Sequence, residues 1–260
     1  MPKLTAVILT KNEESYIAEC IESLRWADEI VVFDSGSTDR TVEIAQELGV
    51  RVIQHPFRDF ASQRNAALNM VESDWIFFVD ADERVTPELA TEVLSAIQDP
   101  QRVGWWVPFH QYLCGRLTLH AGCYPAYALR LLRKGRAYFD PKQKVHERVI
   151  LDGEAGYLQN PLIHINCENW SGFMEHQDRW AHYKAEILFD TGLKPTYHLV
   201  AGPLLEFLRR FIFLQGYKDG LHGLILSTIF AYYVFIMYAR LWRLWRSNGK
   251  RARAESSLEG

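Results

Sequence analysis

Over its first hundred residues the chain alternates short apolar runs with amphipathic stretches. The apolar runs are rich in β-branched and aromatic residues and end at turn residues, which is typical of buried strands. We expect strands at Leu4–Leu9, Glu29–Phe33, Val50–Ile53 and Trp75–Val79. Apolar residues spaced three or four apart predict helices between them. These helices cover Glu13–Leu24, Thr41–Leu48 and Phe60–Met70, and a fourth begins at Pro87 after the capping residue Thr86. This alternation predicts an α/β fold with a mostly parallel sheet and helices on both faces.

Beyond residue 100 the alternation stops and shorter strand-like runs follow. They lie at Val103–Phe109, Leu129–Leu132, Ala137–Phe139 and Val145–Leu151. These runs fit a small mixed extension of the same sheet. We therefore expect residues 1–100 and 101–170 to form two halves of one domain. Residues 171–248 are expected to form a helical region, and residues 249–260 a disordered tail.

The helical region contains a long stretch without charge. Helical spacing predicts helices at 180–188 and 204–215, and the 17 residues Gly223–Ala239 carry no charged side chain. Such a run can span a bilayer, although its length is at the lower limit for spanning. It can also lie in the membrane interface, or form a buried contact between copies of the chain. Trp242, Trp245 and the neighbouring arginines favour monotopic attachment, and homo-oligomer formation stays open.

Charge is distributed unevenly along the chain. The formal net charge is −3, but residues 1–200 hold 20 Lys and Arg against 28 Asp and Glu. Residues 201–254 hold nine basic residues and two acids. An acidic body with a basic, apolar end indicates an anionic membrane surface as partner. No nucleic-acid motif accompanies these charges, so we expect no nucleic-acid partner. Four scattered cysteines and the absence of a signal-peptide pattern favour a reducing compartment.

Polar residues follow three of the predicted strands. Asp80 and Asp82 come directly after Trp75–Val79, Asp34 ends the second strand, and Thr10–Glu13 follows the first. The carboxyl ends of parallel strands share one edge of a sheet, where α/β folds bind ligands. Carboxylate oxygens at that edge suit Mg²⁺ or Mn²⁺, which can neutralise a diphosphate. The alternative roles are ordinary ones, because such acids also cap turns and open helices.

A second group of candidates lies elsewhere in the chain. Arg64 is a cation that can clamp a phosphate, or a solvated surface residue. In the run Val145–Val149, His146 can complete a metal shell and Glu147 can act as a base. Because strand residues alternate in direction, both can act only if the strand bends there. Acceptor-side candidates in the polar and aromatic region 110–150 are Tyr124, Tyr127 and Arg130.

Several motifs together resemble the inverting glycosyltransferases of family 2, especially the bacterial lipopolysaccharide inner-core β-glucosyltransferases. The motifs are Val7–Glu14, Ala27–Thr41, Phe78–Glu83, Gly122–Pro125, Arg130–Arg133, Val145–Val149 and Ala231–Phe235. The resemblance implies a GT-A nucleotide-sugar fold, a divalent metal, a nucleotide-diphosphate sugar donor such as a UDP-sugar, and a glycan or glycolipid acceptor. It also implies an enzyme at the cytoplasmic face of the inner membrane.

The resemblance assigns roles to individual positions. It places Thr10, Asn12, Glu13 and Asp34 at the donor, Arg64 near its phosphates, Asp80 at the ribose or the metal, and Asp82 at the metal. The chain departs from the pattern at Ala126, where many relatives carry an acid, so Glu147 becomes the candidate base.

Two other functions remain open from the sequence. A sugar-phosphate nucleotidyltransferase would use a similar sheet, but its glycine-rich loop is missing, because residues 10–14 contain no glycine. The other alternative is an inactive, membrane-docked protein that binds nucleotide sugars.

Overall fold

We describe a computed structural model of the chain. It describes residues 1–141, 148–167, 169–195 and 198–256, of which 248–256 are described by their backbone alone. The chain divides into two compact units. An α/β unit comprises residues 1–110 and 125–165, and a helical unit comprises residues 111–124 and 166–260. We describe each unit by itself.

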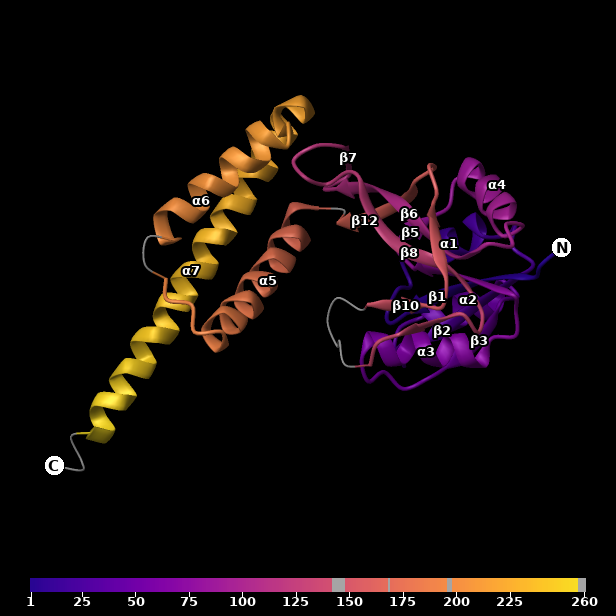
Figure 1. Cartoon of the computed structure of the whole chain (residues 1–260), viewed down its shortest axis with the longest axis horizontal. Helices are drawn as coiled ribbons and strands as arrows, with labels where there is room; N and C mark the ends of the chain where they lie inside the picture. The colour runs from indigo at the N-terminus through magenta and orange to yellow at the C-terminus, as the bar shows by residue number, and fades with distance from the viewer. Residues whose placement is uncertain (142–147, 168, 196–197, 257–260) are drawn as a thin grey trace. The chain divides into compact units, whose positions relative to one another are not determined.

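Four parallel strands form the first half of the α/β unit (Figure 1). They are β1 (Leu4–Thr10), β2 (Glu29–Asp34), β3 (Arg51–Gln54) and β4 (Trp75–Asp80). They lie in the order β3-β2-β1-β4, with β1 pairing in parallel with both β2 and β4. Each lies within about a residue of its predicted position. The predicted parallel α/β arrangement is therefore confirmed here.

Helices cover both faces of these strands. They are α1 (Ile17–Ser23), α2 (Thr41–Glu47), α3 (Phe60–Met70) and α4 (Pro87–Ala96). Side chains of α1, α2 and α4 share one buried cluster with Phe77 and Val79, while α3 packs against Ile76 and Phe78 on the other face. Because consecutive residues of a strand point to opposite faces, the unbroken apolar run of β4 serves both cores.

Two details of this half follow from local hydrogen bonds. The N-cap of α4 is Thr86, as predicted, and its side chain accepts from the amide of Leu89. In contrast, α1 begins at Ile17 and not at Glu13. The amide of Glu13 donates to Thr41 Oγ1 at 2.8 Å and the amide of Glu14 donates to Asp39, so these residues form a loop that is tied to the start of α2.

The second half adds strands of mixed direction, as expected. They are β6 (Arg102–Leu113), β8 (Ala126–Arg133), β11 (Glu154–Tyr157) and β12 (Leu162–Cys167), and β12 pairs with β5 (Glu83–Arg84) of the first half; β7 (Arg116–Thr118) belongs to the helical unit. Strand β8 pairs antiparallel with both β4 and β6, so it joins the two halves into one sheet. A separate pair consists of β9 (Ala137–Phe139) and β10 (Val149–Leu151). Residues 145–147 of the predicted strand lie outside the described residues.

The helical unit is built on one long helix. Its elements are α5 (Trp170–Asp190), α6 (His198–Leu208), a π-helical turn η1 (Arg209–Phe213), a 3₁₀ turn η2 (Gly216–Asp219) and α7 (Gly220–Ser256). Both α5 and α6 pack against α7 (Figure 1). Ala181 and Ala185 of α5 meet Tyr233, Met237 and Leu241 of α7 in a buried cluster.

The predicted helix at 204–215 differs from the observed one. Helix α6 begins earlier, at His198, continues through Pro203 and changes to the wider π-helical turn at Arg209. Gln215 then adopts a left-handed backbone with φ 56°, which ends the segment. Helix α7 runs on to Ser256, past the point where the sequence predicts a disordered tail. Within the described chain, residues 216–247 form the one helical stretch that is long and apolar enough to cross a membrane.

Candidate active site

A cavity lies at the carboxyl ends of the parallel strands in the α/β unit. The loops after β1, β2 and β4 all contribute to it, as the sequence predicts, and the start of α3 closes one side. Its lining consists of Leu9, Thr10, Lys11, Glu13, Ser35, Phe57, Phe60, Gln63, Arg64, Asp80, Ala81 and Asp82. Charged groups of both signs therefore meet in a single concave site.

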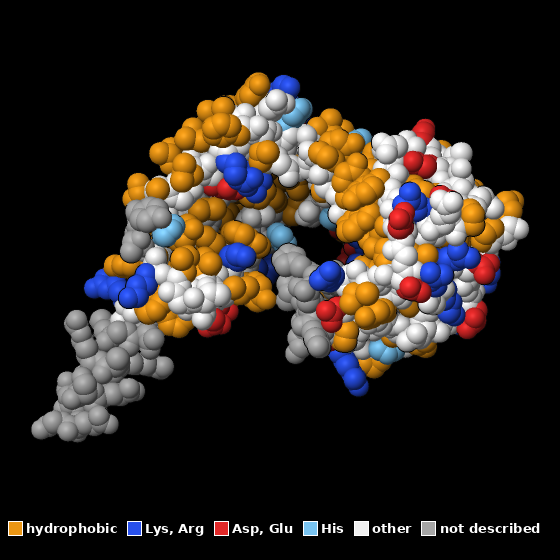
Figure 2. All heavy atoms as spheres, in the orientation of Figure 1, with side chains coloured by type: hydrophobic (Ala, Val, Ile, Leu, Met, Phe, Trp, Pro, Cys, Tyr) orange, Lys and Arg blue, Asp and Glu red, His pale blue; other side chains and the backbone are white. Residues whose placement is uncertain are grey.

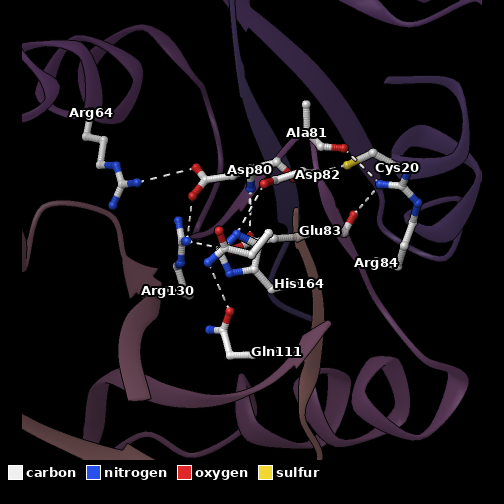
Figure 3. A network of polar contacts seen from close by, with 11 residues as sticks. Cys20, Arg64, Asp80, Ala81, Asp82, Glu83, Arg84, Gln111, Arg130 and His164 are labelled. Carbon is white, nitrogen blue, oxygen red and sulfur yellow. Dashed lines mark hydrogen bonds and ion pairs between the residues drawn. The ribbon is translucent and has the colours of Figure 1, made fainter. Parts of the chain in front are cut away.

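Asp80 is held between two arginines at the end of β4 (Figure 3). Arg64 Nη2 of α3 lies 3.4 Å from Asp80 Oδ1, and Arg130 Nη2 of β8 lies 2.6 Å from Asp80 Oδ2. Arg130 also donates to Glu83 Oε1 at 2.7 Å, and Glu83 Oε2 accepts from the amide of Asp80 at 2.8 Å. Arg130 thus links both carboxylates, and both oxygens of Asp80 are engaged by arginines.

Burial and charge act in opposite directions on this cluster. Burial by itself raises the pKa of Asp80, but the charges of Arg130 and Arg64 outweigh it and hold that pKa well below its usual range. For Glu83, whose side chain is fully buried, burial is the largest influence and the pKa is raised despite Arg130. Asp80 is consequently an ionised carboxylate whose orientation is fixed from both sides.

Asp82 pairs with a histidine that the sequence analysis does not identify. His164 Nε2 of β12 lies 3.1 Å from Asp82 Oδ2 (Figure 3). Burial lowers the pKa of His164, but the hydrogen bond and charge of Asp82 outweigh it, so the pKa is raised. His164 is brought here because β12 pairs antiparallel with β5, opposite Glu83. The only sequence signal is a polar side chain inside the strand-like run Leu162–Cys167.

Glu13 faces the same cavity from the loop after β1. Burial raises its pKa from 4.5 to about 7, and the negative charges of Asp82, Asp39 and Asp80 add to the effect. A carboxyl group with a pKa near neutrality is a marker of functional sites, although structural networks can produce one too.

Three other predicted donor residues take part in the loop structure. Asp34 is completely buried and does not line the cavity, since its carboxylate accepts from the amides of Gly36 and Ser37, both at 3.0 Å. Thr10 Oγ1 also donates to Asp34, at 3.2 Å. Asn12 Oδ1 accepts from the amide of Thr38 at 2.8 Å. In this structure Asp34 and Asn12 fix the turn after β2, and their role at a donor stays a prediction.

The remaining predicted residues lie in different places. Arg130, predicted on the acceptor side, lies almost buried beneath Asp80 and Glu83. Tyr127 is exposed on β8 and packs edge-on against Tyr157. Tyr124 belongs to the helical unit. His146 and Glu147 lie outside the described residues, so their predicted roles as ligand and base stay predictions.

The described residues offer a partial metal site. They contain no group of three His, Cys, Asp or Glu side chains that could hold a metal ion. Asp82 and His164 offer one oxygen and one nitrogen 3.1 Å apart. Magnesium is commonly bound by one or two protein carboxylates, with substrate phosphates and water completing its octahedral shell. The pair is therefore compatible with a cation that arrives together with a diphosphate, and it does not form a closed protein cage.

Comparison with known proteins identifies the family. Residues 5–163 match the model of glycosyl transferase family 2. The chain is 33% identical to the lipopolysaccharide core biosynthesis glycosyltransferase LpsC of Rhizobium meliloti, over 94% of each chain. It is 28% identical to an uncharacterized glycosyltransferase of Rickettsia bellii, over 92% of this chain and 86% of that one.

Among solved structures, S. aureus TarS 1–349 in complex with UDP aligns with a TM-score of 0.49 and 17% identity. The alignment covers 95% of this chain and 92% of that one. The assignment depends on the sequence matches, which cover the cavity residues as well as most of the chain. The chain is therefore a glycosyltransferase and belongs to glycosyl transferase family 2.

Proposed function

We propose that this enzyme transfers a hexose from a UDP-sugar to a hydroxyl group of a glycan or glycolipid, with inversion at the anomeric carbon and with a divalent cation. The observation that carries the proposal is the cavity that Asp80, Asp82 and Arg64 line together, with Arg64 of α3 in contact with Asp80 at the end of β4. A nucleotide diphosphate needs both cationic and cation-binding groups around it, and this cavity presents both.

In the proposed reaction the acceptor oxygen attacks the anomeric carbon as the bond to the diphosphate breaks. The proton of the hydroxyl passes to a carboxylate base, for which Glu147 is the candidate. Arg64 lies near the departing phosphates, where its guanidinium can offset the growing negative charge. Arg130 and Glu83 hold Asp80 in place beside it. Holding both substrates in reacting geometry contributes the largest entropic advantage, up to several kcal/mol.

The cation would be held by Asp82, with His164 beside it and phosphate oxygens as further ligands. When bound, it supplies positive charge that stabilises the leaving diphosphate. Mg²⁺ and Mn²⁺ fit the carboxylate and phosphate oxygens of this donor set, since oxygen ligands are the ones that both ions prefer. Asp80 is the second candidate ligand, because each of its oxygens accepts from one arginine and keeps a further lone pair.

The acceptor is proposed from the relative that covers nearly all of the chain. That relative is named for lipopolysaccharide core biosynthesis, and 33% identity over 94% of both chains supports a related acceptor. We therefore propose a lipopolysaccharide core precursor or a similar envelope glycolipid as the acceptor. Such a substrate places the enzyme at the cytoplasmic face of the inner membrane, attached through its C-terminal helices.

Donor hydrolysis tests this proposal most directly. The purified full chain is incubated with a panel of nucleotide sugars, with Mn²⁺, with Mg²⁺ and with EDTA, and the release of nucleoside diphosphate is measured. We expect release from a UDP-hexose that depends on the cation. Release of pyrophosphate from a nucleoside triphosphate and a sugar phosphate would show a nucleotidyltransferase instead. Binding of the donor without turnover, even with a core acceptor present, would show an inactive binding protein.

A further inference from the structure

Helix α6 is strongly apolar but has no buried core. Its eleven residues carry one acid and no Lys or Arg, and none of them is buried, nor is any residue of η1. Six apolar side chains of α6, η1 and the start of α7 are more than half exposed. They are Val200, Leu204, Leu205, Ile212, Phe213 and Leu221, and we call them the α6–η1 surface. Figure 2 shows hydrophobic side chains gathered over this part of the helical unit.

The exposed charges of residues 198–247 are of one sign. Between residues 198 and 247 the chain has two acids, Glu206 and Asp219. Glu206 is mostly buried and pairs with Arg209 at 2.8 Å and Arg210 at 2.6 Å. Asp219 is also mostly buried and pairs with His120 at 2.7 Å. The exposed charges in this stretch are therefore basic, and they include Arg209 and Lys218 beside the apolar residues.

We propose that the α6–η1 surface is the face by which the protein docks on an anionic lipid bilayer, with its apolar side chains in the interface and its basic residues at the headgroups. The inference rests on the proposed membrane attachment and identifies the element responsible for it. Apolar area and electrostatic attraction to anionic lipid are the two contributions that hold such surfaces to membranes.

A second copy of the chain is a poorer occupant. Residues 201–254 have a balance of nine basic residues to two acids, so two such regions repel each other, whereas anionic lipid attracts them. A membrane-spanning α7 also fits poorly. Charged and exposed residues of α5, among them Glu175, Arg179 and Glu186, lie on a helix that packs along α7. Crossing the bilayer would carry them into hydrocarbon.

Hydrogen bonds connect the α6–η1 surface to the loop that precedes Tyr124. Within the helical unit, Arg210 Nη1 donates to the carbonyl of Ala121 at 2.8 Å, and the amide of Ala121 donates to the carbonyl of Leu214 at 2.9 Å. The amide of His120 donates to Asp219 at 3.0 Å. A bilayer that holds η1 therefore also holds this loop near the headgroups, where a lipid-linked acceptor presents its sugar.

Vesicle flotation of the full chain tests the proposal. We expect the wild type to float with vesicles that contain phosphatidylglycerol. Its binding to pure phosphatidylcholine vesicles should be weaker by about tenfold or more. The double variant Leu205→Glu with Phe213→Glu should lower binding to anionic vesicles by about tenfold or more, because it removes two exposed apolar anchors and adds negative charge. The matched control Met70→Glu with Leu94→Glu changes exposed apolar residues of α3 and α4 and should bind as the wild type does.

Unchanged binding of the Leu205→Glu, Phe213→Glu variant would overturn the proposal. So would a dimer in lipid-free solution that light scattering detects in the wild type and not in this variant, because the surface would then be covered by a second copy. Circular dichroism and donor hydrolysis of the variant should match the wild type. If the wild type itself hydrolyses no donor, that result counts against the proposed activity. Vesicle binding tests the α6–η1 surface independently of hydrolysis.

Discussion

Arg130 Nη2 lies 2.6 Å from Asp80 Oδ2 and 2.7 Å from Glu83 Oε1, so one guanidinium donates to two carboxyl groups at the end of β4. Replacing Arg130 with methionine keeps the side-chain volume but leaves two acids facing each other, one of them fully buried. Removing one partner of a buried ion pair typically costs about 3–5 kcal/mol. We expect Arg130→Met to lower the free energy of unfolding by that amount in urea denaturation, and to abolish transfer.

Arg136→Met is the matched control, because Arg136 pairs with Asp152 on the surface of the same unit. Exposed pairs contribute about 0–1 kcal/mol, so this variant should stay close to wild-type stability. Arg130→Lys should recover part of the loss, since an ammonium keeps the charge but cannot reproduce the planar fork of the guanidinium. Equal stability of the Arg130→Met and Arg136→Met proteins would show that the charge cluster does not stabilise the fold.

Asp34 gives a prediction that separates turn structure from donor binding. Its carboxylate accepts hydrogen bonds from two amides and from the hydroxyls of Thr10 and Ser37. Asp34→Ala leaves these donors without their acceptor, and we expect a loss of about 1–3 kcal/mol of stability. Thermal or urea denaturation measures this loss. If the variant is as stable as the wild type but binds UDP poorly, the residue acts at the donor and the turn does not need it.

The sequence predicts the first half of the fold well because its signals are local. Each buried strand is an unbroken apolar run, and turn residues or a helix cap mark where it ends, as at Thr86. The convergence of Thr10, Ser35 and Asp80 on one cavity follows from parallel strand order alone. No local pattern could place Arg130 under Asp80, however, because that contact depends on β8 lying antiparallel beside β4.

His164 shows the same limit at the site itself. It reaches Asp82 because β12 pairs with the two-residue strand β5, a pairing between segments about eighty residues apart. The π-helical turn at Arg209 is equally hidden, since the residues of η1 read as ordinary continuation of the preceding helix. Long-range strand pairing and helix irregularity depend on how the whole chain packs, so they leave little signal in the local sequence.

Glu13 predicts a pH dependence of stability. Its pKa is raised to about 7, against 4.5 for the ordinary group. Between these values the native state retains a proton that the unfolded chain has released, so the free energy of unfolding falls as pH rises through this window. Glu13 is partly exposed, and after discounting for solvent screening we expect the effect to be about 1 kcal/mol.

Burial raises the pKa of Glu83 in the same window, so Glu13→Gln should make this slope shallower by the contribution of Glu13, and urea denaturation at both ends of the window measures the change. The control Glu47→Gln replaces an exposed acid of α2 and should keep the wild-type slope. Asp82→Asn should lower the pKa of Glu13 toward 4.5, because Asp82 is the largest of the charges that raise it, and carboxyl NMR titration can follow this. A pKa of Glu13 that is already near 4.5 in the wild type would contradict the account of this loop.

His164 is expected to support cation binding through its contact with Asp82. His164→Phe removes the ring nitrogen but keeps a ring against Phe109, which the histidine meets edge-on at 6.0 Å between centroids. We expect Mn²⁺ affinity in the presence of UDP to fall by about 10–100-fold, the range typical of groups that orient metal ligands. Calorimetry measures the affinity. His182→Phe, an exposed change on α5, is the control, and equal Mn²⁺ affinity in both variants would exclude a role for His164.

Asp82 is the residue on which the proposed cation depends most. Its carboxylate lines the cavity, is partly exposed, and contacts His164 among the described side chains, so Asp82→Ala should fold normally. Removing the main support of a charge-stabilising group typically costs about 10²–10³-fold in turnover, and loss of the cation can abolish it.

We expect EDTA to stop donor hydrolysis by the wild type, added Mn²⁺ to restore it, and the Asp82→Ala protein to remain inactive at every Mn²⁺ concentration. Asp152→Ala, an exposed acid of the same unit, should respond as the wild type does. Cation-dependent turnover by Asp82→Ala at the wild-type rate would place the metal elsewhere in the chain, and turnover of the wild type in EDTA would show that Arg64 and its neighbours stabilise the leaving diphosphate without a cation.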